Sequence, residues 1–164
     1  MEIVAQHLQQ QAIKRREHLE RDLFGRSAFN RYYYAMFLDV KTGLGGLRPE
    51  WGNEIAHKAV PELLRGTVKT HLQQGSKKAL RANDAEVVSL CEKAKSAAES
   101  LAKMMDQGRA TRVAADYTPD IPVEFSTSAD FSLNTVSVEE ARQWPYRARG
   151  LIAIIASAWK QIHV

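Results

Sequence analysis

Apolar side chains recur every three or four residues over most of the chain, which is the spacing of amphipathic helices. The spacing predicts a first helix over residues 2–23 and a second, densely aromatic helix from Ser27 to about Lys41. Gly25 is expected to interrupt the pattern between them. The next loop is expected at a group of helix-breaking residues, Gly43, Gly45, Gly46 and Pro49.

The middle of the chain predicts two further helical segments. Asn53 is expected to cap a helix that begins near Glu54, and Pro61 is expected either to kink this helix or to start another. Gly75 and the basic residues after it are expected to form a connection. Asp84 then caps the longest and most regular helix, which is predicted to end near Arg112.

Residues 117–136 break the helical pattern with prolines and alternating apolar residues, which favours an ordered loop, with or without a short hairpin. Ser137 and Glu140 form a capping-box pattern at the start of the last helix. Pro145 is expected to bend that helix or to delay its start. The fold class that follows is all-α, an antiparallel four- to five-helix up-and-down bundle with one long loop before the last helix.

The composition is that of an ordinary folded protein: of 164 residues, 45% are apolar and 26% charged, so one domain over residues 1–164 is expected. The single cysteine, Cys91, is expected to be a small buried side chain. The start of the chain lacks a signal-peptide pattern, and no apolar run reaches the ~20 residues of a membrane span. A soluble, cytoplasmic protein without membrane contact is therefore predicted.

Charge is uneven along the chain. Residues 1–81 hold 14 Lys/Arg against 8 Asp/Glu, whereas residues 82–164 hold 9 against 11. The basic first half is compatible with a polyanionic partner and equally with solvated helix faces. The five histidines lack the spacing of metal ligands, and the glycines after Lys41 lack the lysine of a phosphate-binding loop. No metal and no cofactor are therefore predicted.

The most informative stretch is Arg112-Val113-Ala114-Ala115-Asp116-Tyr117, an Arg-x-x-Ala-Asp-Tyr string at the end of the longest predicted helix. A second string, Asn30-Arg31-Tyr32-Tyr33-Tyr34-Ala35-Met36-Phe37, lies in the aromatic helix. In their order and separation the two strings resemble the prokaryotic branch of the HEPN superfamily, the higher-eukaryote-and-prokaryote nucleotide-binding helical domains. The likeness covers about residues 20–160, including Ser137 to Ala141.

The resemblance implies a HEPN-like antiparallel helical bundle that pairs as a homodimer. It also implies a place in prokaryotic toxin–antitoxin systems with nucleotidyltransferases, in antiviral defence or in RNA cleavage. Active members are similar in carrying, after the arginine, a polar residue and then a histidine four to six positions from it. Here Val113 follows Arg112, and residues 116–119 are Asp, Tyr, Thr and Pro. With ordinary pKa values of about 3.9 and about 10, Asp116 and Tyr117 are poorly matched to proton transfer near pH 7.

Several functions stay open at this point. The first hypothesis is a noncatalytic or weakly catalytic module that binds RNA, a nucleotide or a nucleotidyltransferase-type partner. Arg109 and Arg112 would clamp phosphate beside Tyr117, with polar residues of the aromatic helix lining the same cleft: Asn30, Arg31 and Tyr34. The other large side chains of the aromatic helix, Tyr32, Tyr33, Met36 and Phe37, are expected to pack in the core.

Three alternatives remain. A metal-independent endoribonuclease would use Arg112 with Asp116 or Tyr117, or with His57 or His71 supplied by another helix or a partner subunit. An assembly adaptor would display Trp144 and Trp159 on the last helix. In a purely structural interpretation, Arg112 pairs with Asp116 and Tyr117 covers the end of the bundle.

Overall fold

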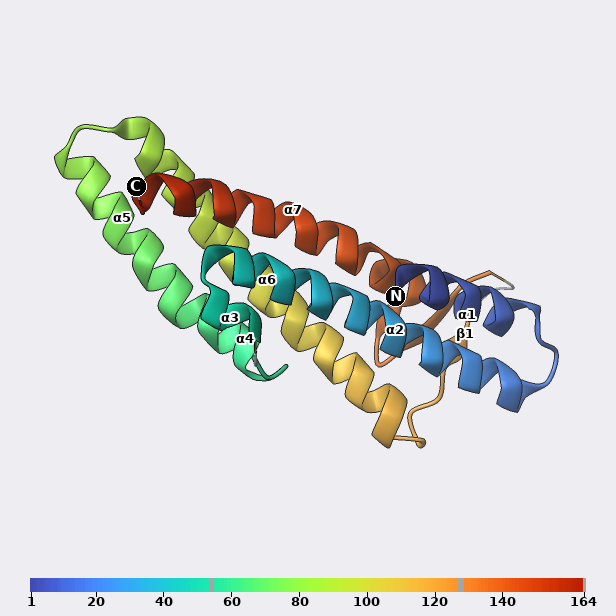
Figure 1. Ribbon diagram of the computed structural model, residues 1–164. Helices are drawn as coiled ribbons and strands as arrows, with labels where there is room; N and C mark the ends of the chain where they lie inside the picture. The colour runs from blue at the N-terminus through green and yellow to red at the C-terminus, as the bar shows by residue number, and fades with distance from the viewer. Residues whose placement is uncertain (54, 127–128, 164) are drawn as a thin grey trace. The chain divides into compact units, whose positions relative to one another are not determined.

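The structure is a computed structural model that describes residues 1–53, 55–126 and 129–163. The chain is predominantly helical, and a small sheet precedes the last helix (Figure 1). Its elements are α1 (Glu2–Lys14), α2 (His18–Leu47), α3 (Pro49–Asn53), α4 (Ala59–Leu63), the π-helix η1 (Leu64–Val68), α5 (Lys69–Arg81), α6 (Ala85–Tyr117), β1 (Glu124–Phe125), β2 (Phe131–Leu133), β3 (Val136–Ser137) and α7 (Val138–Ile162).

The chain packs into two compact units. The first unit comprises Met1–Leu38 and Gln107–Tyr146, and the second comprises Asp39–Asp106 and Arg147–Val164. Helices α2, α6 and α7 each supply residues to both. Because most of the described residues are helical, the predicted all-α class is confirmed for the bulk of the chain, and the small sheet is an addition to it. The HEPN-like bundle stays a prediction.

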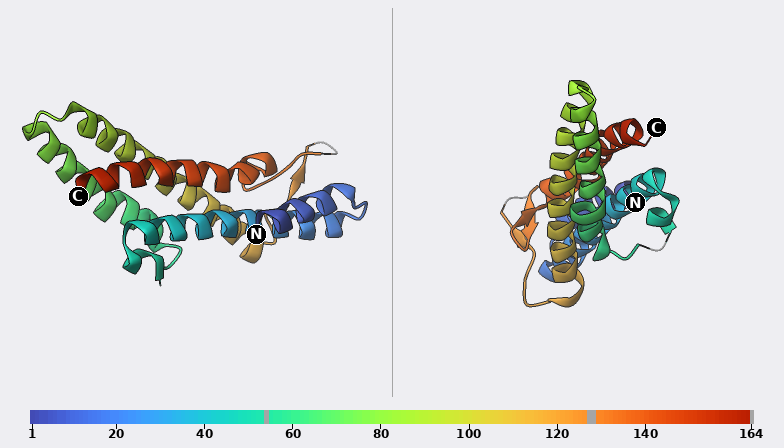
Figure 2. Two further views of the ribbon diagram at one scale, coloured as in Figure 1. Left: turned by 45° about the horizontal axis from the view of Figure 1, so that its top comes forward. Right: turned by 90° about the vertical axis from the view of Figure 1, so that its left-hand side faces the viewer.

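In the first unit, α1 lies alongside the beginning of α2 (Figures 1 and 2). The predicted helix over residues 2–23 with a break at Gly25 is wrong, because α1 ends at Lys14 and α2 runs unbroken from His18. The break falls where the apolar spacing lapses between Ile13 and Leu19. Gly25 is helical and buried, since a Cβ there would lie 3.0 Å from Val123 Cγ1.

The aromatic face of α2 is core, as expected. Tyr32, Tyr33 and Met36 have no exposed surface, and burial raises the pKa of both tyrosines to about 12. The Tyr32 hydroxyl donates a hydrogen bond to Gln9 Oε1 of α1 at 2.6 Å, which satisfies its polar end. Phe29 adds an edge-to-face contact with Phe131 of β2, so the sheet closes over the same core.

The long segment before α7 contains an antiparallel sheet of order β1-β2-β3. Strand β2 pairs with both neighbours, in the registers Phe125↔Phe131 and Leu133↔Val136. Asn134 and Thr135 form the two-residue turn between β2 and β3, with φ values of 50° and 66°. Positive φ at both positions is the type I′ geometry of tight hairpins, and for the β-branched Thr135 it is strained. The described part of the expected loop therefore holds three strands.

Helix α7 begins where the capping pattern predicts. Ser137 Oγ accepts a hydrogen bond from the Glu140 backbone N–H at 3.1 Å, which satisfies one of the free donors at the helix start. The helix then continues through Pro145 to Ile162. A delayed start at Pro145 is therefore wrong.

The second unit begins with the glycine-rich end of α2, where the predicted loop is also wrong. The helix continues to Leu47, and its glycines allow close packing. A Cβ on Gly45 would lie 3.0 Å from the Gly52 Cα of α3, so the two backbones touch directly. Asn53 is the last residue of α3 and does not cap a following helix, and Glu54 lies outside the described residues.

Residues 59–81 are helical throughout, as α4, η1 and α5. Pro61 is the third residue of α4, where a backbone N–H has no partner within the helix, so the proline breaks nothing. The π-helix that follows carries Arg65, which pairs with Glu99 at 3.3 Å and Asp106 at 2.7 Å on α6. Gly75 lies inside α5 against Ile162, so the connection predicted there is wrong.

The turn between α5 and α6 is set by two residues. Asn83 adopts a left-handed φ of 57°, and the Asp84 backbone N–H donates to Ala79 O at 2.9 Å, which together form a Schellman-type ending of α5. Asp84 Oδ1 then accepts from the Val87 N–H at 3.1 Å and caps α6, as predicted. Helix α6 has Cys91 buried, also as predicted.

Among the described residues, no helix is both long and apolar enough to cross a membrane.

Gly43 should tolerate alanine poorly because a Cβ would lie 2.4 Å from Cγ2 of the stiff, β-branched Ile152. We expect Gly43→Ala to lower the free energy of unfolding in urea by about 1–2 kcal/mol, the overpacking cost less the gain in helix propensity. Gly150→Ala is the matched control, since a Cβ there meets nothing within 4 Å. It should raise stability by up to about 1 kcal/mol. Equal effects at the two positions would refute this account of the packing.

Candidate functional site

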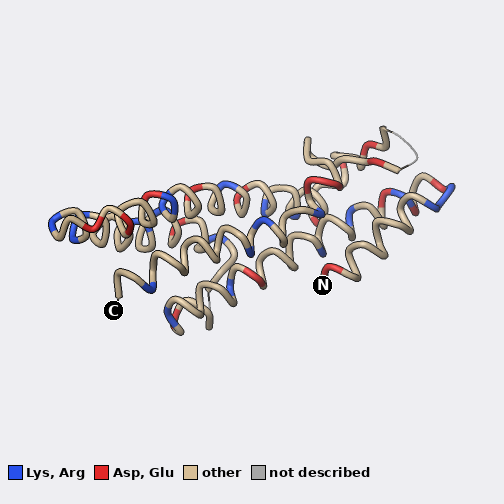
Figure 3. Tube along the Cα trace, turned by 90° about the horizontal axis from the view of Figure 1, so that it is seen from above, with Lys and Arg blue, Asp and Glu red and all other residues tan. Residues whose placement is uncertain are grey.

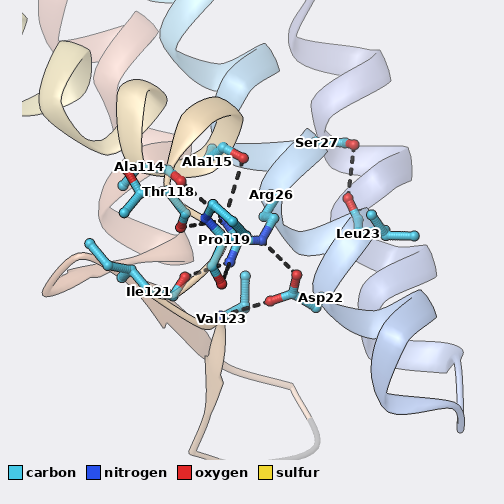
Figure 4. A network of polar contacts seen from close by, with 10 residues as sticks. All are labelled: Asp22, Leu23, Arg26, Ser27, Ala114, Ala115, Thr118, Pro119, Ile121 and Val123. Atoms are coloured by element: carbon cyan, nitrogen blue, oxygen red, sulfur yellow. Dashed lines mark hydrogen bonds and ion pairs between the residues drawn. The ribbon is translucent and has the colours of Figure 1, made fainter.

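The end of α6 is held by Arg26 of α2 (Figure 4). Its Nη1 donates to Ala114 O at 3.0 Å, Ala115 O at 3.4 Å and Thr118 O at 3.3 Å. Its Nη2 donates to Pro119 O at 3.2 Å and to Ile121 O. The last carbonyls of a helix lack hydrogen-bond donors within the helix and carry partial negative charge. A guanidinium supplies both the donors and a positive charge.

Asp22 completes this capping arrangement one turn earlier on α2. Its Oδ2 lies 2.6 Å from Arg26 Nε, and its Oδ1 accepts a hydrogen bond from the Val123 backbone N–H at 2.9 Å. The Asp22 and Arg26 side chains are only 17% and 11% exposed, so the pair is shielded from water. One carboxylate therefore orients the arginine and also fixes the chain as it enters the sheet.

Small residues on α6 allow it to approach the aromatic face of α2. A Cβ on Gly108 would lie 2.7 Å from Met36 Cε and 3.0 Å from Tyr33 Cδ2. One and two turns later, Thr111 and Ala115 are buried as well. The alanine of the Arg-x-x-Ala-Asp-Tyr string is thus largely buried, and the arginine, aspartate and tyrosine supply the polar groups of the site.

Asp116 is held by both helices. Its Oδ1 accepts a hydrogen bond from Asn30 Nδ2 of α2 at 2.7 Å. Its Oδ2 lies 2.8 Å from Arg112 Nε in an ion pair, although the Nε–H is not aligned for a hydrogen bond. The expected Arg112–Asp116 pair is therefore present, and Asn30 adds a link to α2.

Arg112 lies between two tyrosines. Its guanidinium carbon is 5.8 Å from the ring centre of Tyr34 and 5.4 Å from that of Tyr117, distances of cation–π contacts. Its Nη2 donates to the Tyr34 hydroxyl at 3.4 Å. Burial alone would lower the pKa of Arg112, but Tyr34, Asp116 and Tyr117 outweigh it and raise the pKa. Tyr117 is 67% exposed, so it does not cover the end of a bundle.

An open pocket of about 330 Å³ adjoins this cluster. Arg31 lines it and is itself exposed, whereas Arg109 is exposed one turn before Arg112 on α6. The lining residues are Leu23, Arg26, Ser27, Asn30, Arg31, Ala115 and Asp116. We call Asn30, Tyr34, Arg112, Asp116 and Tyr117, with this pocket, the Arg112 site.

The described residues include no group of three or more His, Cys, Asp and Glu side chains placed to hold a metal. His57 and His71, the histidines considered as remote bases, belong to the second unit. His71 contacts Arg48 and His163 there. Within the first unit, the proton acceptors that the structure describes at the Arg112 site are the Asp116 carboxylate, which contacts Asn30 and Arg112, and the phenols of Tyr34 and Tyr117.

Sequence reasoning missed Arg26 and Asp22. Both were present in the sequence as an i, i+4 acid–base pair on α2, a spacing that usually indicates an exposed ion pair. Arg26 also precedes Asn30 and Tyr34 by one and two turns on the same helix. That spacing was the available signal that all three side chains share a face.

Comparison of the chain with protein-family models, with curated proteins and with solved structures finds no match.

We expect Arg26→Gln to lower the free energy of unfolding in urea by about 2–4 kcal/mol, because several carbonyls and Asp22 lose a charged, largely buried partner. Arg31→Gln removes the same charge from an exposed position on the same helix. It should change stability by less than about 0.5 kcal/mol. A similar, small effect of both substitutions would contradict the capping role of Arg26.

Proposed function

We propose that this protein is a HEPN-like module that binds RNA or a nucleotide at the Arg112 site and does so with little or no catalysis. The resemblance of the two motifs to the HEPN superfamily supports this class. It also supports a setting in a prokaryotic defence or toxin–antitoxin system with a nucleotidyltransferase-type partner, and pairing as a homodimer.

The observation that carries the proposal is the environment of Arg112. An arginine held between two aromatic rings, beside a pocket of about 330 Å³, offers a fixed cation for phosphate and ring faces for a base. Arg31 lies on the pocket lining and Arg109 one turn away on α6, so both are available as further phosphate contacts. Pockets of this volume are at the small end of ligand sites, which suits one nucleotide unit.

The same geometry disfavours catalysis. Cleavage of RNA by its own 2′-hydroxyl needs a proton acceptor within hydrogen-bond reach of that hydroxyl. Asp116 Oδ1 already accepts from Asn30, and Oδ2 pairs with Arg112. An endoribonuclease that used Asp116 as the base would have to draw on a carboxylate whose two oxygens already contact Asn30 and Arg112. One that used Tyr117 would rely on a phenol, whose ordinary pKa of about 10 is poorly matched to proton transfer near pH 7.

Net charge also bears on the mode of binding. The first unit carries nine Lys/Arg against ten Asp/Glu, a net charge of −1, whereas the second carries 14 against nine, a net charge of +5. Figure 3 shows both signs interspersed along the helices. An anion at the Arg112 site must therefore be held by a few fixed arginines, since the unit's overall charge offers no attraction.

An adaptor built on the last helix is less well supported. Trp144 is fully buried and Trp159 is 6% exposed, so neither ring presents an apolar surface to a partner.

We expect Arg112→Ala to weaken the binding of a short single-stranded RNA by tenfold or more, on the order of one charge-assisted contact. Binding should be measured by fluorescence anisotropy at several salt concentrations. The slope of log affinity against log salt concentration should become shallower by about the contribution of one phosphate contact. Arg142→Ala is the control: it removes the same charge from an exposed arginine of the first unit that pairs with Glu139 on α7. It should leave the affinity nearly unchanged.

Two results would count against this proposal. Absence of RNA or nucleotide binding by wild-type protein at low salt would contradict the proposed binding role of the Arg112 site. RNA cleavage in EDTA by wild-type protein but not by Arg112→Ala would replace the binding module with an endoribonuclease.

A further inference from the structure

A chain of polar contacts links α5 to the end of α7 in the second unit. Arg48 Nη2 lies 3.3 Å from His71 Nε2, and His71 Nδ1 lies 3.3 Å from His163 Nε2. His163 Nδ1 lies 3.1 Å from the Trp159 carbonyl oxygen. His71 belongs to α5. Trp159 belongs to α7, and His163 is the residue directly after the end of that helix. We call this arrangement the histidine relay.

Only one placement of protons satisfies every contact. The Arg48 guanidinium can only donate, so His71 Nε2 must accept and the proton of His71 sits on Nδ1. That N–H donates to His163 Nε2, which must therefore be unprotonated. The proton of His163 is then on Nδ1, where it donates to the Trp159 carbonyl. Both imidazoles are neutral in this arrangement.

We propose that the histidine relay is a pH-sensitive latch that holds the end of α7 against α5 at neutral pH and releases it in mild acid. A second proton on His71 would place an Nε2–H against the Arg48 guanidinium. A second proton on His163 would place an Nε2–H against the His71 Nδ1–H. Either proton therefore replaces a hydrogen bond with two opposed donors and brings positive charges together.

The surroundings of the relay act mainly in the same direction. Burial, followed by the charges of Arg48 and His163, lowers the pKa of His71 from its ordinary value of 6.5. Glu50 of α3, 3.7 Å from the Arg48 guanidinium, pairs with the arginine and offsets part of its positive charge. A depressed pKa in the folded state means that the stabilisation is complete above about pH 6.5 and is lost as pH falls through the folded-state pKa.

Release would act on a defined piece of α7. Trp159 is stacked on His163 at 4.1 Å and lies edge-on to Trp51 of α3 at 5.3 Å. Ile162 packs on Gly75 of α5, where a Cβ would lie 2.4 Å from its Cγ2. A pocket of about 180 Å³ adjoins this contact, lined by residues that include Gly75, Gln161 and Ile162. Opening the latch would expose Trp159 and widen this pocket.

The proton positions can be measured directly on wild-type protein. Long-range ¹H–¹⁵N spectra at pH 7.5 should place the proton of both His71 and His163 on Nδ1. Amide exchange over residues 158–162, corrected for intrinsic rates, should lose several-fold in protection between pH 7.5 and pH 5. Protection over residues 138–146 of the same helix should stay constant. Protons on Nε2, or unchanged protection at residues 158–162, would overturn the latch.

Variants separate the relay from general acid sensitivity. The double substitution His71→Gln/His163→Gln removes both imidazoles of the relay and should abolish the pH-dependent loss of protection at residues 158–162. His7→Gln/His18→Gln is the control, because both residues are exposed in the first unit. It should keep the wild-type pH dependence. Full pH dependence in the relay variant would refute the proposal, and the wild-type measurements decide it if that variant does not fold.

Discussion

The contact of Arg26 with the last carbonyls of α6 is the constraint on which the candidate site depends. A helix end left without partners would be costly in a packed unit, and one guanidinium serves five carbonyl oxygens there. Asn30 and Tyr34 follow Arg26 at successive turns of α2. Fixing Arg26 at the end of α6 therefore places these two side chains opposite Asp116 and Arg112.

This arrangement separates two roles within one short motif. Ala115 is buried, whereas Arg112 and Asp116 contact the polar residues Tyr34 and Asn30 of α2 and Tyr117 is exposed beside Arg112. Asp116 is occupied by its two partners, while Arg112 is framed by aromatic rings beside an open pocket. The site thus offers a fixed cation and ring faces, and this geometry is the support for the proposed recognition of an anion.

Much of the fold follows from the sequence, and the differences have specific causes. The aromatic core of α2, the Asp84 cap and the Ser137 cap are local signals and were predictable. The breaks predicted at glycines are wrong, because Gly25, Gly45 and Gly75 lie inside helices at positions where a Cβ would come within 3.0 Å or less of a neighbouring segment. Such close approach depends on partners distant in sequence. The same is true of the site: the Arg112–Asp116 pair is local, but Asn30 and Arg26 reach it from residues more than 80 positions away.

The most direct test is a titration of ¹⁵N-labelled protein with a short single-stranded RNA, followed through side-chain resonances. The account predicts that Arg112 Nε and Asn30 Nδ2 shift first and saturate together, although the second unit carries the positive net charge. Shifts confined to the lysines and arginines of α5, with Arg112 and Asn30 unchanged, would contradict it.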